Sequence, residues 1–189
     1  NELFNILNIK KKDFIYTHGR VIPDKKFEYV IEAMKYLSNE KLIISGTIEK
    51  NYKKKLKELI KRSGLEKKVK ILGRISEEQL IKLYNEAKVF VLTAPHEDFG
   101  IVPIESMSCG TPVIAWNDGA GPSETVINNI NGFLAKPYNI KDLADKIKIA
   151  LTKKWNKNKI RRSVEKFSEE NQSKIFIEKI DDVIKNYNL

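Results

Sequence analysis

Short apolar segments alternate along the chain with longer segments in which apolar side chains recur at helical spacing. Within residues 26–37 the apolar positions return every three or four residues, which marks one face of a helix. The same spacing predicts helices over residues 51–63, 76–87, 140–151, 156–167 and 169–187. The short β-branched runs predict strands over residues 14–19, 41–46, 69–73, 88–94, 111–116 and 132–136.

Strands joined by helical crossovers of about a dozen residues run parallel in one sheet. The strand 88–94 has almost no polar interruption, so we expect it to be buried on both faces. The predicted fold class is therefore α/β: a doubly wound, Rossmann-like parallel sheet with helices on both faces and a helical C-terminal tail. No repeat or linker divides the chain. Residues 1–189 are expected to form one domain, with 156–189 as a C-terminal helical extension.

Glycines, histidines and isolated charges gather in the segments that follow the predicted strands. These segments read GRVIPDKK, GTIEKN, GRIS, APHEDFG and NDGAGPSE. Because the carboxyl ends of parallel strands meet at one edge of a sheet, the segments predict a single ligand-binding edge.

The net charge of +10 says less about partners than its size suggests. Five of the 35 basic residues are Arg, and the other 30 are Lys spread over the helical segments. Dispersed Lys is typical of a solvated helix face. Attraction to an anionic membrane surface is the second interpretation. No nucleic-acid partner is expected, because Arg, the residue favoured for contacts to phosphate and guanine, is scarce. The single Cys109 fits a reducing compartment, so we expect a cytoplasmic location, at the inner face of the membrane if the basic surface binds lipid. Without an initial Met, the chain is expected to be a piece of a longer protein.

Several common sites are excluded by their missing motifs. No G-x-G-x-x-G follows the first strand, and no Walker A pattern, metal-spaced His/Cys set or Ser–His–Asp trio is present, so no metal is expected. His18 is expected to be structural, and His96 an ordinary loop residue. The aromatic side chains expected in the core are Tyr16, Phe90, Trp116 and Phe133.

The segment HEDFGIVPIESMSCG, residues 96–110, predicts a helix that begins at Gly100, since Pro103 is tolerated in a first turn. The free amides from Gly100 to Val102 would form a seat for phosphate. Glu105, one turn into this helix, could accept hydrogen bonds from a ribose diol, and Glu97 from hydroxyls on the other side of the phosphates.

Arg20 and Lys25 lie five residues apart across a loop that contains Pro23. Both are expected to turn toward the same anion, Arg as a fork and Lys as a point charge. Together with the helix terminus they could stabilise negative charge on a departing diphosphate. A nucleotide-diphosphate sugar, which has hydroxyls on both sides of its phosphates, fits this arrangement.

Four motifs in order extend over nearly the whole chain: GRVIPDKKFEYVIEAM, LGRISEEQLIKLYNEAKVFVLTA, EDFGIVPIESMSCGTPVIA and GPSETVINNINGFL. With these motifs the chain resembles the C-terminal, donor-binding domain of a retaining glycosyltransferase of family four, which has the two-Rossmann-domain GT-B architecture. The first motif matches the family's G-R-x4-K stretch, and the third matches its E-x7-E signature.

The resemblance implies a role for each matching residue. Arg20 and Lys25 match the diphosphate ligands, Glu97 the glutamate that contacts the sugar, and Glu105 the glutamate that holds the ribose. Phe99, Gly100, Ile101 and Val102 match the loop whose backbone touches the sugar and phosphate. Gly19 and Arg74 are further candidates for donor binding, Arg74 at the base or a phosphate. For Arg74, a structural bond to a loop carbonyl is an equal alternative.

The resemblance also implies transfer of a sugar from a nucleotide donor with retention at the anomeric carbon, usually without a metal or other cofactor. The glycan or lipid-linked acceptor would bind an N-terminal domain that is absent here, so the isolated domain is expected to be inactive. The ending Gly-Pro-x-Glu-Thr, residues 121–125, resembles mannosyltransferases and favours GDP-mannose. Lys26 departs from the family's usual Gly. The alternatives are a non-catalytic nucleotide-sugar-binding module and a basic protein that binds a membrane surface or nucleic acid.

Overall fold

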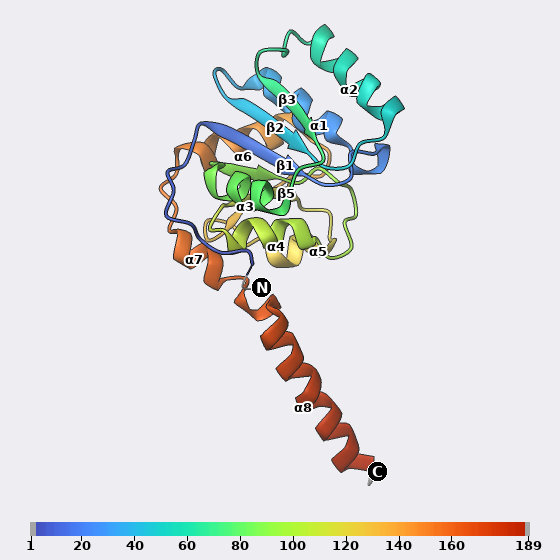
Figure 1. Ribbon diagram of the computed structural model, residues 1–189, viewed down its shortest axis with the longest axis vertical. Coiled ribbons are helices and arrows are strands. Elements are labelled where there is room, and N and C mark those ends of the chain that lie inside the picture. The colour runs from blue at the N-terminus through green and yellow to red at the C-terminus, as the bar shows by residue number, and fades with distance from the viewer. Residues whose placement is uncertain (1–2, 188–189) are drawn as a thin grey trace.

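The computed structural model describes residues 3–187 and contains, within that range, a six-stranded parallel sheet (Figure 1). The strand order is β3-β2-β1-β4-β5-β6, so that β1 pairs with both β2 and β4. This is the order of a doubly wound Rossmann-like sheet, and the predicted fold class is confirmed. The strands span Phe14–His18 (β1), Lys41–Ser45 (β2), Val69–Gly73 (β3), Val89–Val91 (β4), Val113–Trp116 (β5) and Gly132–Ala135 (β6).

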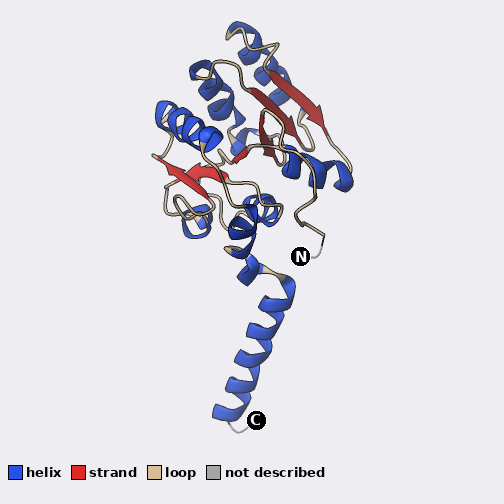
Figure 2. Ribbon diagram, turned by 90° about the vertical axis from the view of Figure 1, so that its left-hand side faces the viewer, coloured by secondary structure: helices blue, strands red, loops and turns tan. Residues whose placement is uncertain are grey.

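Helices cover both faces of the sheet, as Figure 2 shows with the strands in red between helices in blue. Three short 3-10 turns, named η, supplement them. The helices span Phe27–Ala33 (α1), Lys50–Arg62 (α2), Glu77–Glu86 (α3), Ile101–Ser108 (α4), Gly121–Thr125 (α5), Ile140–Thr152 (α6), Lys157–Arg162 (α7) and Glu169–Tyr187 (α8). The turns are Pro23–Lys25 (η1), Met34–Tyr36 (η2) and Glu165–Phe167 (η3).

Alternate side chains of the strands enter two apolar cores on opposite faces of the sheet. In β1, Ile15 packs in the core beneath α1, α2 and α6, whereas Phe14 and Tyr16 pack in the core beneath α3, α4 and α7. Both faces of the strand are therefore buried, which explains its apolar sequence. The aromatic residues expected in the core are all buried: Tyr16, Phe90, Trp116 and Phe133.

Local signals set several helix ends as expected. Ser76 accepts a hydrogen bond from the amide of Gln79, whose side chain accepts one from the amide of Ser76, which completes a capping box at the start of α3. Helix α2 ends just before Gly64, which has a φ of +65°, in the left-handed region that favours glycine.

Some predicted bounds were wrong. Lys26 adopts a left-handed conformation and precedes α1 as its N-cap, so the helix begins one residue late and then tightens into η2. The segment 156–167 divides into α7 and η3. Strand β4 ends at Val91, and the Thr93 carbonyl instead accepts a hydrogen bond from the Trp116 indole. The segment 121–125, expected as loop, forms the short helix α5.

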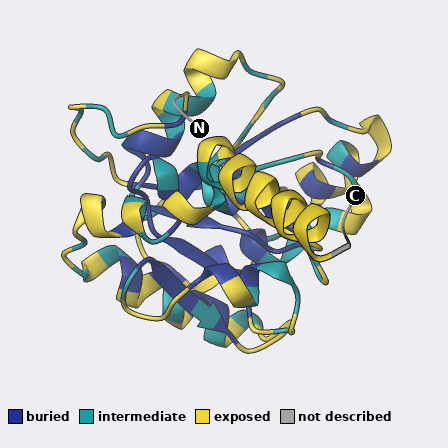
Figure 3. Cartoon of the chain, turned by 90° about the horizontal axis from the view of Figure 1, so that it is seen from below, coloured by how far each residue is buried: buried dark blue, intermediate teal, exposed yellow. Residues whose placement is uncertain are grey.

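The C-terminal helix α8 extends away from the sheet and its helices (Figure 1), and it is exposed along its length in Figure 3. The predicted helical tail is thus confirmed. No helix within residues 3–187 is long and apolar enough to cross a membrane.

Two isoleucines on α6 provide a matched test of the packing. Ile147 is fully buried, whereas Ile149 is 48% exposed. Ile147→Ala should lower the free energy of unfolding by about 2–5 kcal/mol, since it removes buried methyl groups and leaves a cavity. Ile149→Ala, the control, should cost less than about 1 kcal/mol. Urea denaturation measures both, and equal losses would contradict the packing of α6 on the sheet.

Candidate functional site

A continuous cleft lies at the carboxyl ends of the central strands. It consists of two adjoining cavities of about 330 and 340 Å³, which share His18, Gly19, Arg20 and Val102 as a common wall. The first cavity extends toward η1 and the loop before α4, and the second toward the ends of β2 and β3. The predicted ligand-binding edge therefore contains a cleft made of two connected parts.

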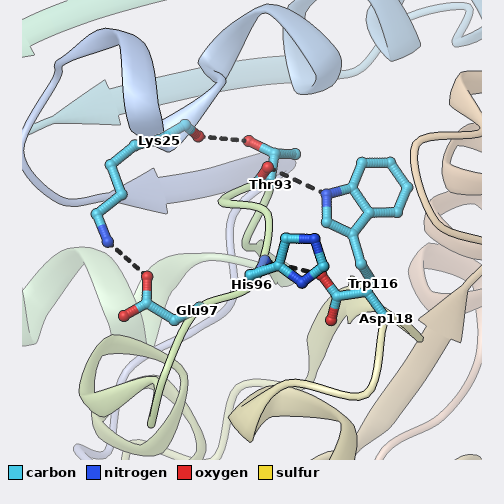
Figure 4. A network of polar contacts seen from close by, with 6 residues as sticks. All are labelled: Lys25, Thr93, His96, Glu97, Trp116 and Asp118. Carbon is cyan, nitrogen blue, oxygen red and sulfur yellow. Dashed lines mark hydrogen bonds and ion pairs between the residues drawn. The ribbon is translucent and has the colours of Figure 1, made fainter.

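Lys25 and Glu97 lie together in the first cavity. The Lys25 ammonium lies 2.5 Å from the Glu97 carboxylate, and both side chains are about one-quarter exposed (Figure 4). Lys25 comes from the turn η1, and Glu97 from the loop between β4 and α4. From the sequence, these two side chains were expected to contact different parts of a ligand, yet the structure joins them as an ion pair. Arg20 is exposed and lines both cavities.

Helix α4 begins at the first cavity, as predicted. Gly100 is its N-cap with a φ of 78°, and no side chain within residues 3–187 caps it. Gly100, Ile101 and Val102 all line the cavity, and Phe99 joins them from the preceding loop. The amide groups of this first turn carry the positive end of the helix dipole, which makes the wall suitable for an anion.

Glu105 and Arg74 belong to the second cavity. Glu105 lies one turn into α4, and its Oε2 accepts a hydrogen bond of 2.9 Å from the Tyr84 hydroxyl. Burial raises the pKa of this carboxyl above its ordinary value, while the bond from Tyr84 opposes the shift. Arg74 follows β3 and is exposed. The cleft thus has Glu97 in one cavity and Glu105 in the other.

His18, which was expected to be structural, lines both cavities. Its Nδ1 lies 2.8 Å from the Ser45 hydroxyl, which in turn lies 2.6 Å from the Tyr16 hydroxyl. Burial lowers the pKa of His18 to about 4, so the ring is neutral at pH 7. Its location at the carboxyl end of the first strand, just before Gly19, was the signal that could have placed it in the cleft.

Gly46 permits the close approach of the segment after β1 to the end of β2, beneath the cleft. A Cβ atom at Gly46 would lie 1.7 Å from the carbonyl oxygen of Gly19, so no side chain fits there. The Gly19 amide in turn donates to the Ser45 carbonyl over 3.2 Å. This contact holds the loop that carries Arg20 against the end of β2.

No group of three or more His, Cys, Asp or Glu side chains within residues 3–187 gathers in a way that could hold a metal ion. The positive charge along the cleft comes from Arg20, Lys25, Arg74 and the start of α4.

Comparison with known proteins identifies the family of the chain. Residues 1–174 match the family described as glycosyl transferases group 1. An uncharacterized glycosyltransferase of Methanocaldococcus jannaschii is 36% identical over 130 residues, which cover 67% of this chain and 32% of that protein. An alpha-1,3/1,6-mannosyltransferase of Dictyostelium discoideum is 32% identical over 164 residues, 77% of this chain and 39% of that enzyme.

Among solved structures, Anabaena HepE in complex with UDP and glucose is similar, with a TM-score of 0.70 and 28% identity over 82% of this chain and 42% of that one. The chain belongs to the glycosyl transferases group 1 family, and its sheet matches one domain of GT-B glycosyltransferases. It spans well under half the length of each of these relatives.

The neutral state of His18 predicts an acid-sensitive fold. The unfolded chain binds a proton at His18 near pH 6.5, whereas the folded chain does so only near pH 4. Stability should therefore fall as the pH is lowered from 6.5 to 4, with a contribution of up to about 3 kcal/mol from this residue. His18→Gln should flatten the dependence of the unfolding free energy on pH in this interval, as measured by urea denaturation. An unchanged slope would show that His18 is not buried in its neutral form.

Proposed function

We propose that this chain is the donor-binding, C-terminal domain of a retaining hexosyltransferase. Its ligand would be a nucleotide-diphosphate sugar, and the acceptor would bind an N-terminal domain elsewhere in the parent protein. One observation carries the proposal: Arg20 and the start of helix α4 lie between the carboxylates of the first cavity, Glu97 and Asp98, and those of the second, Glu77 and Glu105. This order of charges matches a sugar, a diphosphate and a ribose in sequence.

The diphosphate would lie in the section that the two cavities share. Arg20 would bind it as a fork, and the amides of Ile101 and Val102 at the start of α4 would face its oxygens. Gly19 would let the backbone approach closely. When the bond between the sugar and the diphosphate breaks, negative charge develops on the leaving oxygen. Arg20, Lys25 and the helix terminus would stabilise this charge without a metal ion.

The two glutamates would bind opposite ends of the donor. Glu105 retains oxygen lone pairs beyond its bond to Tyr84, and these would accept hydrogen bonds from the ribose. Arg74, in the same cavity, would lie beside the base or a phosphate. Glu97 would accept hydrogen bonds from the transferred sugar, with the ammonium of Lys25 fixing its carboxylate and Phe99 beside it.

GDP-mannose is the donor that we favour. The name of the Dictyostelium relative and the Gly-Pro-x-Glu-Thr stretch support mannose, whereas the HepE complex contains UDP. The acceptor would be a glycan or a lipid-linked glycan. The basic residues on helices such as α2 would allow peripheral contact with an anionic membrane at its cytoplasmic face.

A thermal-shift panel of GDP, UDP and ADP sugars tests the proposal directly. A ligand that binds only the native state raises the melting temperature, and we expect the largest shift with GDP-mannose. EDTA should leave that shift unchanged, because protein groups supply the positive charge. No shift with any of the nucleotide sugars would refute the proposed function, and a larger shift with a UDP sugar would refute the choice of donor.

Glutamine variants of the two glutamates should separate their roles. Glu105→Gln should weaken the binding of both the nucleoside diphosphate and its sugar conjugate by about 1–3 kcal/mol, which is the cost of losing a hydrogen bond to a charged group. Glu97→Gln should leave nucleoside diphosphate affinity nearly unchanged and, in the parent protein, mainly reduce turnover. Calorimetry with both ligands measures the difference. Equal damage to nucleoside diphosphate binding by both variants would contradict the division.

The isolated chain is expected to bind its donor but to transfer no sugar, since the acceptor half of the cleft would be missing. A transfer assay with a glycan or lipid-linked acceptor checks this expectation, and the full-length parent protein is the positive control. Robust transfer by residues 1–189 would contradict it.

A further inference from the structure

The loop that carries Glu97 contains a backbone conformation that histidine rarely adopts. His96, immediately before Glu97, has a φ of 48°, in the left-handed region. Such a conformation persists only where surrounding contacts hold it. The amide of His96 donates a hydrogen bond of 2.9 Å to Oδ2 of Asp118, which Figure 4 shows directed at the loop, and the Tyr138 hydroxyl lies 3.1 Å from Nε2 of His96.

Asp118 is itself fixed at the end of β5. Its second oxygen, Oδ1, accepts a hydrogen bond of 3.3 Å from the amide of Ala120. The Ser123 hydroxyl accepts from the Gly119 amide and donates to the Trp116 carbonyl, which closes the loop between β5 and α5. The acceptor for the His96 amide therefore belongs to a hydrogen-bonded loop that directly follows a buried strand.

The same strand end also holds Lys25. The Trp116 indole donates to the Thr93 carbonyl over 3.0 Å, and the Thr93 hydroxyl donates to the Lys25 carbonyl over 3.3 Å. Both members of the Lys25–Glu97 ion pair are thus connected to β5 and the residues directly after it (Figure 4).

Gly121 supports the loop from a second direction. Its amide donates to the Glu97 carbonyl over 3.0 Å. A Cβ atom at this position would lie 2.3 Å from the Asp98 carbonyl oxygen, so the loop packs directly on the glycine backbone. The loop therefore has contacts on both sides, and the contact from Asp118 acts on its strained residue.

We propose that Asp118 is a positioning residue for Glu97. By accepting the His96 amide, it holds His96 in the left-handed conformation and so directs the next side chain toward Lys25 and the sugar end of the cleft. Asp118 acts through the loop and needs no contact with the donor. The ligand-binding part of this inference rests on the proposed function, because Glu97 is assigned to the sugar there.

Three variants test the role by calorimetry on this chain, with GDP and GDP-mannose and with UDP and UDP-glucose in parallel. Asp118→Ala should lower the affinity for the nucleotide sugar by about tenfold, as expected for loss of one charged contact. It should lower the affinity for the nucleoside diphosphate by less than about twofold. Asp118→Asn should lose less sugar affinity than Asp118→Ala, because its single amide oxygen can still accept from His96 although its NH2 group cannot replace the acceptor for Ala120. The double variant Asp118→Ala/His96→Gly should regain sugar affinity, because glycine adopts this φ without strain.

Asp142 provides a matched control. Its carboxylate also accepts a backbone amide, that of Lys136 over 2.7 Å, but at the end of β6 and away from the cleft. Asp142→Ala should leave both affinities unchanged. Amide hydrogen exchange gives a measurement that needs no ligand: the amide of Gly121, which donates to the Glu97 carbonyl, should exchange faster in Asp118→Ala than in the unaltered chain and in Asp118→Asn.

The outcomes separate the two ideas. The positioning role would be overturned if the amide exchange rate is unchanged in Asp118→Ala. It would also be overturned if this variant loses affinity equally for the nucleotide sugar and the nucleoside diphosphate and has a lower melting temperature. If the unaltered chain binds none of the four ligands, the proposed function fails, and the exchange experiment still decides whether Asp118 holds the loop. Faster exchange with selective loss of sugar affinity and recovery in the double variant supports the inference.

Discussion

Pairing of β1 with strands on both of its sides is the constraint on which the cleft depends. From β1 the chain crosses to β2 by way of α1, on one face of the sheet, whereas β4, on the other side of β1, is followed by α4 on the opposite face. The segments that follow β1 and β4 therefore separate, and a crevice opens between them at the carboxyl ends. Arg20 and Lys25 come from one side of this crevice, and Glu97 from the other.

Close backbone contacts give the crevice its shape. Gly46 allows the loop after β1 to lie on the end of β2, and Gly121 allows the loop before α4 to lie on the start of α5. In both cases a Cβ atom would overlap a carbonyl oxygen of the other segment. Parts of the cleft wall are thus formed by backbone packed directly on backbone, which fixes the positions of the two loops relative to the sheet and to α5.

Charges along the cleft are distributed so that neither sign is concentrated. Lys25 is paired with Glu97, Glu105 accepts from the neutral hydroxyl of Tyr84, and His18 is kept neutral by burial. The unpaired positive end of α4 lies between the two glutamates. A ligand with an anionic middle and hydroxyl-bearing ends is complementary to this distribution, whereas a uniformly charged ligand is not.

The sequence by itself determined the elements of this protein and the edge at which its polar residues gather. Hydrophobic periodicity depends on neighbouring residues, so it predicted all six strands and the helical tail within residues 3–187, and the loop composition predicted the ligand edge. Local patterns were less reliable at element ends, where tertiary contacts compete with them. Lys26 leaves the helix that its neighbours form, and residues 121–125 become helical beneath a loop that packs on them.

Only the tertiary structure decided which side chains meet. Lys25 and Glu97 are 72 residues apart, and His96 and Asp118 are 22 apart, so their contacts follow from strand order and from the depth at which each loop leaves the sheet. The position of His18 beneath both cavities likewise depends on β1 being central. These properties arise from the pairing of distant strands, and no local pattern of residue types encodes that pairing.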